Sequence, residues 1–341
     1  MSIPPFNAPQ ADLPFDAVLP VLRTAGEETR LRILALLVEG ELTVSDLTEI
    51  LGQSQPRISR HLKVMVESGL VERHREGSWV FYRLAEGTPE AQLTHRILSL
   101  LDRTDRVTGA DRERFATVRA QRSAAAQAFF AKLAPQWDRL RSLHVSENLV
   151  ESAILEMLGD KPLGNVLDLG TGTGQILKLL SPRARRAVGV DASHAMLSVA
   201  RANMQAAGLG YIELRQGDIY APSLPRDGFD LVVIHQVLHY LDDPQRAVAE
   251  AARLVGPAGR LMVVDFAAHQ VEQLRETAGH RRLGFAHEQI ASWMLAAGLE
   301  APAVRDLAPP GGDPGKLTVT IWLGRDRRLI SDAPAALMNV A

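Results

Sequence analysis

A glycine-rich loop follows an apolar run near the middle of the chain. Residues 165–169 have the apolar character of a strand, and residues 170–174 read Gly-Thr-Gly-Thr-Gly. Glycines let a loop turn tightly and let a ligand approach its backbone. A dinucleotide-binding fingerprint would need a glycine at position 175, where the chain has Gln175. The spacing therefore predicts a nucleotide-like ligand but departs from the dinucleotide pattern.

Two acidic residues accompany this loop. Asp168 precedes the glycines, and Asp191 ends the next apolar run, residues 186–190. An acidic residue at the end of a second strand accepts hydrogen bonds from a ribose diol, in proteins that bind NAD and in those that bind S-adenosylmethionine. A carboxylate at position 168 can hold the ammonium group of a methionine moiety through the loop. Loop spacing and Asp168 together favour S-adenosylmethionine.

The elements that position these residues alternate between strand and helix patterns. From about residue 150 onward, apolar β runs are separated by helical segments, which is typical of an α/β sheet. Ligands of open α/β sheets bind at the carboxyl ends of the strands. We therefore expect the glycine loop, Asp191 and the residues that follow later strands to share one edge of the sheet.

The N-terminal part has a different pattern, of short helices. Residues 29–37 form an amphipathic helix with Thr29 as its expected N-cap and Gly40 at its end, and a second helix spans 44–51. Gly52 makes a tight turn, and Ser54 is the expected N-cap of a third helix that ends near residue 68. This third helix has a core stripe and an opposite polar face. The stripe is Ile58, Leu62 and Met65, and the polar face is Gln55, Arg57, Ser59, Arg60 and Lys63. The pattern predicts a helix-turn-helix.

A hairpin follows, with strands at 70–73 and 79–83 and a turn at 76–77. Lys and Arg outnumber Glu by six to three between residues 53 and 84, where a recognition helix and a wing would meet DNA. We expect direct readout of bases near the start of the third helix and phosphate or minor-groove contacts elsewhere. The residues expected to read bases are Gln55, Arg57, Ser59 and Arg60, which follow the N-cap Ser54. The residues expected to contact phosphates or the minor groove are Lys63, Arg73 and Arg75. His61 either contacts phosphate or packs under the wing.

Together these segments resemble the ArsR/SmtB family of winged-helix repressors over residues 15–105. The resemblance rests on residues 29–34, 54–63 and 76–84. It implies a homodimer that binds a palindromic operator in double-stranded DNA and releases it when an effector binds.

The metal sites of that family are missing from this sequence. Thr43 and Ser45 stand where many members have cysteines, and the chain contains no cysteine at all. The last helix, from residue 89 to about 104, has only His95 as a histidine. We therefore expect no metal. The same helix has an apolar stripe of Leu93, Ile97, Leu100 and Leu101. The stripe either packs on its own domain or forms the dimer contact that the resemblance favours.

The remaining motifs resemble a class I S-adenosylmethionine-dependent methyltransferase of the ubiquinone/menaquinone-methyltransferase-like group, over residues 126–325. They are the glycine loop, 216–219, 229–235, 237–244 and 254–265. The resemblance implies a Rossmann-like sheet of seven strands, parallel except for one. It also implies that Trp137 lies in a lid helix and covers a ligand, or packs between domains.

The resemblance also implies roles for individual residues. Asp168, Gly170, Thr171, Gly172 and Gly174 line the methionine end of S-adenosylmethionine or S-adenosylhomocysteine, and Asp191 holds the ribose. Ala192 and Met196 flank the adenine, Asp218 and Ile219 contact its edge, and His235 lies beside the sulfonium. Met196 has core packing as an equal alternative.

Methyl transfer needs mainly proximity and alignment, and it needs a general base only when the nucleophile is protonated. His235 and His239 are the candidates, with a structural role as the alternative for each. Two functions remain open. One is a regulator, expected to be a repressor, whose methyltransferase-like domain senses S-adenosylmethionine or S-adenosylhomocysteine. The other is a regulator with an active small-molecule methyltransferase domain. DNA methylation is disfavoured because the Asn/Asp-Pro-Pro-Tyr/Phe motif is absent after the fourth strand, where residues 235–238 stand.

Composition sets the outer limits. The 341 residues fit two domains, and 38 basic against 40 acidic side chains exclude nucleic-acid binding by bulk charge. No apolar run approaches the ~18 residues of a membrane span, and the first twenty residues hold five prolines and no Lys or Arg, unlike a signal peptide. We expect a cytoplasmic protein with a flexible lead-in at 1–14, a helical linker at 106–125 and a tail at 326–341.

Overall fold

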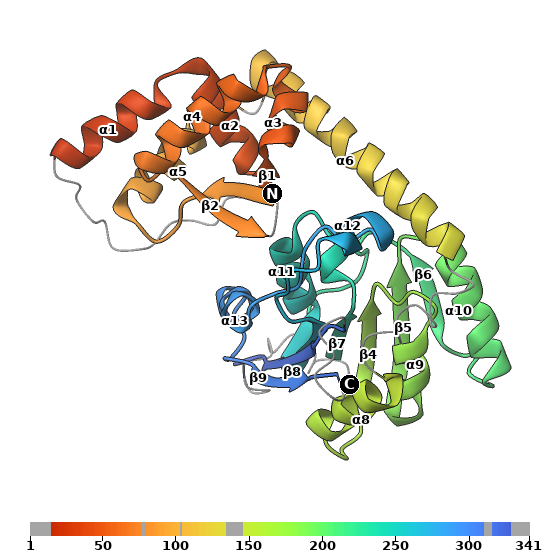
Figure 1. The fold of residues 1–341 in the computed structure, drawn as a ribbon. Coiled ribbons are helices and arrows are strands. Elements are labelled where there is room, and N and C mark those ends of the chain that lie inside the picture. Colours follow the sequence, from red (N-terminus) through yellow and green to blue (C-terminus); the bar gives the residue numbers. More distant parts are fainter. Residues whose placement is uncertain (1–14, 77–78, 103, 134–145, 310–315, 329–341) are drawn as a thin grey trace, which may run out of the picture. The chain divides into compact units, whose positions relative to one another are not determined.

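The computed structural model describes residues 15–76, 79–102, 104–133, 146–309 and 316–328 (Figure 1). The chain divides into two units, Met1–Ser123 (unit 1) and Ala124–Ala341 (unit 2). The expected lead-in at 1–14, Trp137 and most of the expected tail lie outside the described residues. No helix among the described residues is long and apolar enough to cross a membrane.

Unit 1 combines helices with a small antiparallel sheet, as the winged-helix prediction requires. Its elements are α1 (Phe15–Ala25), α2 (Glu28–Leu37), β1 (Leu42–Thr43), α3 (Val44–Leu51), α4 (Gln55–Glu67), β2 (Val71–Glu76), β3 (Trp79–Leu84), α5 (Pro89–Ser99) and α6 (Arg106–Leu133), which continues past the boundary between the units. The sheet has the order β1-β3-β2. Strands β2 and β3 form the predicted hairpin, in which Arg73 pairs with Tyr82.

Local sequence explains the helix-turn-helix. Gly52 adopts a left-handed φ of 64° after α3, a conformation that favours glycine, and this lets the chain turn into α4. Ser54 is the N-cap of α4 as predicted, although its side chain makes no capping hydrogen bond. Ile58, Leu62 and Met65 are fully buried in the core of unit 1, which confirms the predicted core stripe.

Two predicted helix ends are wrong. Glu27, not Thr29, is the N-cap of α2, because its carboxylate accepts a hydrogen bond from the backbone N–H of Arg30 at 2.8 Å. Thr29 lies in the first turn and is buried. Helix α5 ends at Ser99, so Leu100 and Leu101 follow the helix.

The first half of α6 is part of unit 1. Phe115 and Val118 are buried in the same core as α2 and α4. Asp111 is 2% exposed, and its carboxylate accepts two hydrogen bonds from the guanidinium of Arg32 in α2, at 2.7 and 2.8 Å. Residues 106–125, expected as a helical linker, are helical, and these three side chains fix the start of the helix to the winged-helix fold.

Unit 2 is built around one twisted sheet. Its elements are α8 (Glu147–Leu158), β4 (Gly164–Leu169), α9 (Gln175–Leu180), η2 (Ser181–Arg183), β5 (Ala184–Asp191), α10 (His194–Ala206), β6 (Glu213–Gln216), β7 (Phe229–His235), η3 (Leu238–Tyr240), α11 (Pro244–Leu254), β8 (Val255–Phe266), α12 (Gln273–Thr277), α13 (His287–Ala296), β9 (Ala303–Leu307) and β10 (Val319–Arg325).

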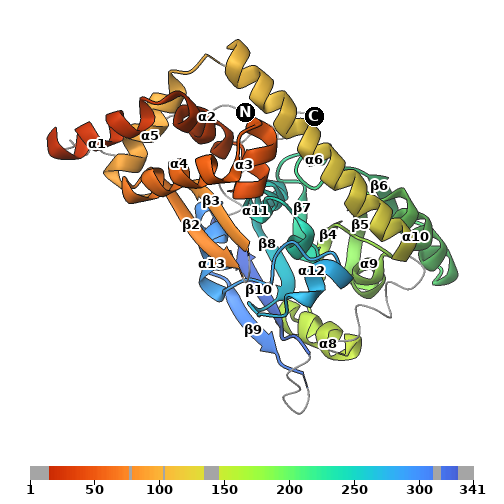
Figure 2. The same ribbon diagram turned by 45° about the horizontal axis from the view of Figure 1, so that its top comes forward.

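The sheet has seven strands in the order β6-β5-β4-β7-β8-β10-β9. Strand β10 runs antiparallel to both of its neighbours, and the other paired strands are parallel (Figure 2). Apolar side chains of α11 and α13 pack on one face, and those of α8 and α9 pack on the other. This confirms the predicted methyltransferase fold and brings the carboxyl ends of β4, β5, β7 and β8 to one edge.

Candidate functional site

The polar face of α4 is open to solvent. Its candidate DNA contacts are all exposed: Ser54, Gln55, Arg57, Ser59, Arg60 and Lys63. They surround the buried Ile58 and Leu62, which hold the helix on the core. Lys63 lies 3.9 Å from Glu67 one turn later, whereas Arg57 and Arg60 form no ion pair with any described residue. The face therefore offers two arginines and a glutamine near the helix start, the side-chain types that read guanine and adenine.

Two further arginines lie on the hairpin. Arg73 and Arg75 are exposed and stand two residues apart on β2, so they point to the same face of the strand. A cationic strand face of this kind suits phosphate contacts.

His61 lies on a different side of α4. Its ring is mostly buried, and Nδ1 lies 3.5 Å from a carboxylate oxygen of Glu27, the cap of α2. Burial lowers the pKa of His61, Glu27 opposes this, and nearby arginines lower it further. The ring thus packs against the start of α2, which favours a structural role over a phosphate contact.

The positions of the family's metal-binding cysteines have another use here. Thr43 is the N-cap of α3, and its hydroxyl accepts a hydrogen bond from the N–H of Asp46 at 3.3 Å. The Asp46 carboxylate accepts one from the N–H of Thr43 at 3.0 Å, completing a capping box. Within the described residues no group of three or more His, Asp or Glu side chains is placed to hold a metal ion.

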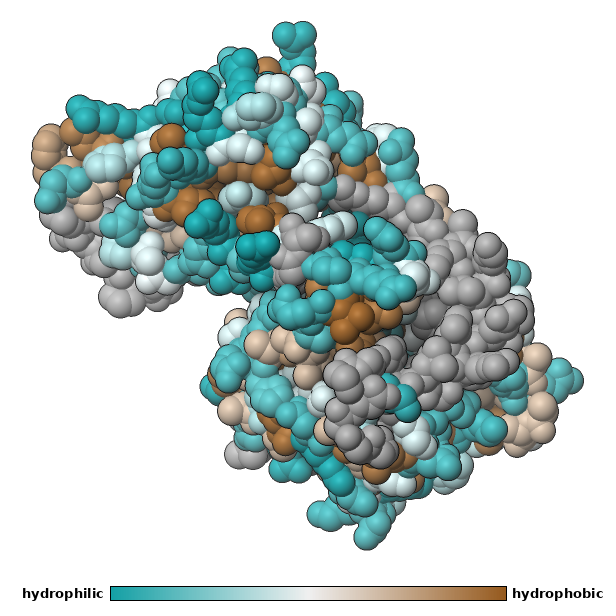
Figure 3. Space-filling model, viewed as in Figure 1, coloured by the Kyte–Doolittle hydropathy of each residue, from teal (hydrophilic) through white to brown (hydrophobic). Residues whose placement is uncertain are grey.

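The apolar stripe of the last helix is divided. Leu93 and Ile97 are partly buried against the core of unit 1, as the structural alternative predicts. Leu100 is 84% exposed, and Phe15 at the start of α1 is 82% exposed. Figure 3 shows apolar areas within the otherwise hydrophilic surface of unit 1. Contiguous apolar patches mark interfaces, so these two side chains are the candidates for one in unit 1.

In unit 2 the glycine loop turns through left-handed backbone. Gly170, Gly172 and Gly174 have φ of 78°, 53° and 84°. A Cβ on Gly170 would lie 2.4 Å from the side chain of Val237, and one on Gly174 would lie 3.0 Å from Met204. Gly170 is therefore required by the packing of Val237 as well as by the turn, whereas at Gly174 only the end of the Met204 side chain would have to shift.

Asp191 fixes this loop to the end of β5. One carboxylate oxygen accepts a hydrogen bond from the N–H of Gly172 at 2.8 Å, and the other accepts from Ser193 at 2.7 Å. Burial raises the pKa of Asp191, and the two backbone hydrogen bonds oppose that rise. Each oxygen keeps a second lone pair, so the carboxylate can still accept from a diol.

The other predicted cofactor residues differ in exposure. Asp168, in the strand before the loop, and Thr171, in the loop itself, are both buried. Ala192 and Asp218 are exposed, and Asp218 accepts a hydrogen bond from the N–H of Tyr220 at 3.0 Å. Ile219 packs partly on the core, and Met196 is 3% exposed, which favours core packing for this methionine.

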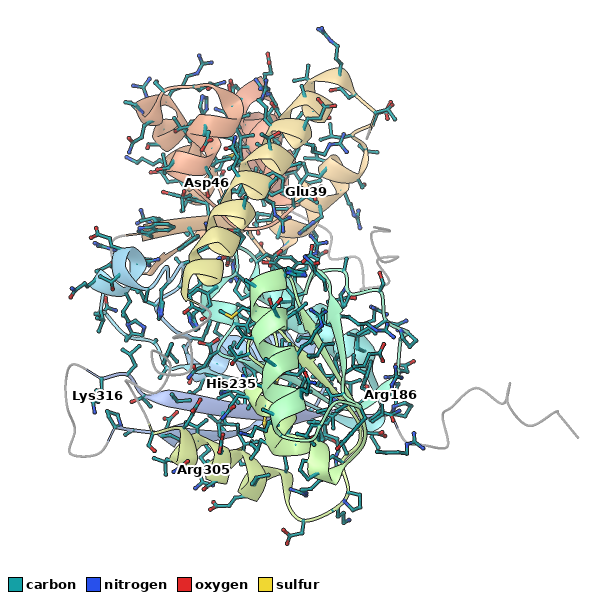
Figure 4. All side chains as sticks on the ribbon, turned by 90° about the vertical axis from the view of Figure 1, so that its right-hand side faces the viewer. Glu39, Asp46, Arg186, His235, Arg305 and Lys316 are labelled. Atoms are coloured by element: carbon teal, nitrogen blue, oxygen red, sulfur yellow. The ribbon has the colours of Figure 1, made fainter. Side chains whose placement is uncertain are left out.

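The carboxyl ends of β7 and β8 carry a second group of polar side chains. His235 ends β7, and its side chain is buried inside unit 2 (Figure 4). Gln236 follows with φ of 52°, a left-handed conformation that costs a non-glycine residue about 1 kcal/mol or more. Such strain is concentrated at functional sites, and nothing in the sequence indicated it.

His239 forms a buried pair that sequence reasoning missed. Its Nδ1 lies 2.7 Å from Oδ1 of Asp265, and the two side chains are 1% and 0% exposed. Oδ1 also accepts from the N–H of Phe266 at 2.8 Å. An aspartate near the end of an adjacent strand was the available signal, since Val264 pairs with His235.

These residues suit S-adenosylmethionine or S-adenosylhomocysteine. A carboxylate at the end of β5 matches a ribose, and a buried carboxylate in the strand before the loop matches an ammonium group. The hydroxyl of Thr171 is buried and has no hydrogen-bond partner among the described residues, as expected of a group that a ligand satisfies.

Comparison with known proteins divides the chain in the same way. Residues 27–73 match the family of bacterial regulatory proteins described as the arsR family, and residues 167–263 match a methyltransferase domain. The biofilm growth-associated repressor of Xylella fastidiosa is 39% identical over 80 residues, which are 24% of this chain and 69% of that protein.

Other relatives match one unit each. The arsenical resistance operon repressor of Escherichia coli is 49% identical over 75 residues, or 21% of this chain and 64% of that protein. The uncharacterized methyltransferase YcgJ of Bacillus subtilis is 33% identical over 115 residues, or 34% of this chain and 46% of that protein. The crystal structure of YcgJ aligns with 53% of this chain over 100% of the YcgJ chain, with 20% identity and a TM-score of 0.44.

Proposed function

Because the chain belongs to the arsR family of bacterial regulators through unit 1 and carries a methyltransferase domain in unit 2, we propose that it is a DNA-binding repressor whose effector is S-adenosylmethionine or S-adenosylhomocysteine. The observation that carries this proposal is the Asp191 carboxylate bonded to the glycine loop, in a chain whose Thr43, at one of the family's metal-binding positions, forms a capping box.

Operator recognition falls to α4 and β2. Gln55, Arg57, Ser59 and Arg60 read base edges in the major groove, and Lys63, Arg73 and Arg75 contact phosphates. The exposure of this face and the burial of its apolar side support the assignment.

The operator-binding form is a homodimer. Phe15 and Leu100, large and exposed in the described chain, supply its apolar contact, with Leu101 beside them. Sedimentation velocity of Leu100→Glu tests this, with Leu295→Glu on α13 as a control. We expect a monomer for the first and a dimer for the second. A Leu100→Glu dimer contradicts the assignment.

The effector is held by the loop and strand ends of unit 2. Asp191 accepts the ribose hydroxyls, Asp168 and Thr171 hold the methionine end, and Asp218 with Ile219 contacts the adenine. When bound, the ligand supplies a charged or neutral sulfur, depending on which of the two it is. It changes DNA affinity only if it binds the DNA-bound and free forms unequally.

Helix α6 connects the two sites. Its first half is fixed in unit 1 by Asp111, Phe115 and Val118, and it continues without interruption to Leu133. The proposed route from the effector site to α2 therefore runs along this helix, and the effect of the ligand on DNA affinity tests it.

The proposal is tested by DNA binding with and without effector. The full chain selects duplexes from a random DNA pool, and fluorescence anisotropy then measures the affinity of the best duplex. We expect S-adenosylmethionine or S-adenosylhomocysteine to change this affinity at least ~5-fold. A chain that selects no duplex would not be a DNA-binding regulator.

A second candidate function is methyl transfer to a small molecule. The specific observation in its favour is the His239–Asp265 pair at the strand ends beside the nucleoside site. A domain that only sensed its ligand would not need a buried histidine and carboxylate at that place.

A further inference from the structure

His239 and Asp265 are arranged as a base and its orienting group. A carboxylate is an acceptor only, so the 2.7 Å contact calls for a proton on Nδ1, and in the neutral imidazole Nε2 then carries a lone pair. Nε2 is buried and has no hydrogen-bond partner among the described residues. An unsatisfied buried acceptor of this kind needs an explanation, and a proton donor from outside the chain supplies one.

The backbone around His239 is held firmly. The His239 carbonyl accepts hydrogen bonds from the N–H groups of Arg281 and Arg282, at 2.9 and 3.0 Å. The ring of His280 lies 4.3 Å from that of His239, and the ring of Phe266 lies 5.0 Å away. The imidazole is thus fixed from β8 and from the segment that follows α12.

The pair is shielded from solvent, since its two side chains are 1% and 0% exposed. Burial raises the pKa of the Tyr240 phenol, and the charge of Asp265 adds to the rise. Between two buried side chains, a carboxylate stabilises positive charge that develops on the imidazole during the reaction more strongly than it would in water.

The pair also stands where an acceptor is needed. His239 lies in η3, just after β7, and Asp265 is the next-to-last residue of β8; β7 is the neighbour of β8 and of β4, which leads into the glycine loop. Resting on the second candidate function above, we propose that His239 is the general base for methyl transfer to a neutral hydroxyl group, an alcohol or phenol, and that Asp265 is its positioning residue.

The chemistry selects this class of acceptor. A carboxylate is already ionised and needs no base, whereas a hydroxyl is a weak nucleophile until its proton is removed. The hydroxyl oxygen forms a bond to the methyl carbon while the carbon–sulfur bond of the donor breaks. The hydroxyl proton moves to Nε2 of His239, and S-adenosylhomocysteine leaves as a neutral thioether.

The test uses the full chain with trideuteromethyl S-adenosylmethionine and two sources of acceptor. One is a set of matched alcohols, phenols, amines, thiols and carboxylates on the same ring skeletons, and the other is a small-molecule extract of bacterial cells. Mass spectrometry finds labelled products and the atom that carries the label. We expect labelled ethers. Labelled amines, thioethers or esters without ethers overturn the proposal, although methyltransferase function then stands.

Two variants assign the roles. His239→Asn keeps a donor for Asp265 and removes Nε2, so ether formation should fall ~100-fold or more. Asp265→Asn should reduce it at least ~10-fold. His287→Asn is the matched control, because His287 also pairs with an aspartate, Asp306 at 3.0 Å, but on an exposed surface. Unchanged ether formation in His239→Asn overturns the proposal.

A spectroscopic readout does not depend on an acceptor. Nitrogen-15 NMR of histidine-labelled protein should show His239 protonated on Nδ1 and bare on Nε2. A proton on Nε2 overturns the proposal even when the variants fail to fold. If no labelled product forms from either source while the chain binds S-adenosylmethionine, both the inference and the second candidate function fail, and the effector proposal is unaffected.

Discussion

The carboxylate of Asp191 accepts a hydrogen bond from the backbone N–H of Gly172 at 2.8 Å, and so joins the end of β5 to the glycine loop after β4. The residue proposed to hold the ribose therefore also sets the shape of the loop proposed to hold the methionine end. The two halves of the nucleoside site form together, and a change at Asp191 affects both.

Asp191→Asn should weaken binding of S-adenosylhomocysteine about 10- to 100-fold, because it replaces a charged acceptor by a neutral amide. Isothermal titration calorimetry measures the affinity, with Asp306→Asn, far along the sheet order on β9, as the control. Equal affinities for wild type and Asp191→Asn contradict the assignment of the ribose site.

The same residue predicts a pH dependence. Burial raises the pKa of Asp191, and only the ionised carboxylate accepts from both ribose hydroxyls. Affinity is therefore full above the raised pKa and falls as the pH drops through it, at a higher pH than for an ordinary aspartate. Calorimetry across the acidic range should show this fall in wild type and not in Asp191→Asn.

Much of this site follows from local sequence, and the rest depends on contacts between distant residues. Asp168, the glycines and Asp191 lie at strand ends, and strand patterns are read over a few residues. The pairing of His239 with Asp265 depends on the register of β7 against β8, which no local pattern specifies. The wrong cap at Thr29 has a similar cause, since Glu27 competes for the same backbone donors.

Helix α6 illustrates the same limit. Asp111, Phe115 and Val118 have helical spacing for one buried face, but the surrounding residues are mostly polar. Only the partner, Arg32 on α2, shows that this segment belongs to the folded core of unit 1.

Gly170→Ala should destabilise the protein more than an alanine substitution at a glycine that only has a positive φ. Gly170 and Gly208 both have positive φ, at 78° and 72°, but a Cβ on Gly208 meets nothing within 4 Å, whereas one on Gly170 meets Val237. Gly208→Ala should cost about 1 kcal/mol of unfolding free energy, and Gly170→Ala clearly more. Denaturant unfolding compares the two variants, and equal costs contradict the close packing of the loop.

Arg57→Ala and Arg60→Ala should each weaken binding to the selected duplex by about 1–3 kcal/mol and relax specificity at one base position. Lys63→Ala should weaken binding evenly across sequences and reduce the slope of log affinity against log salt by about 0.9. Arg201→Ala on exposed α10 is the control. An unchanged affinity in both arginine variants removes α4 from the interface.

Asp111→Asn should destabilise unit 1 by about 2–4 kcal/mol, because it leaves Arg32 without its buried carboxylate. Although burial opposes it, hydrogen bonds from Arg32 and Arg114 hold the pKa of Asp111 below its usual value. The stabilisation is therefore full above the unfolded-state pKa and is lost as the pH falls through the folded-state pKa. Calorimetric unfolding from neutral to acidic pH measures this, and a wild-type advantage that persists at the lowest pH contradicts it.

The most direct test of the regulator proposal is calorimetric titration with S-adenosylmethionine and S-adenosylhomocysteine, with and without the selected DNA duplex. Linkage requires that DNA change the affinity for the effector by the factor with which the effector changes the affinity for DNA. For the wild-type chain we predict that DNA changes the affinity for one of the two ligands at least ~5-fold. For Asp191→Asn we predict weaker ligand binding, with no difference between the affinities measured with and without DNA. If both ligands bind the wild-type chain tightly and DNA alters neither affinity, the two units work independently and the effector proposal is wrong.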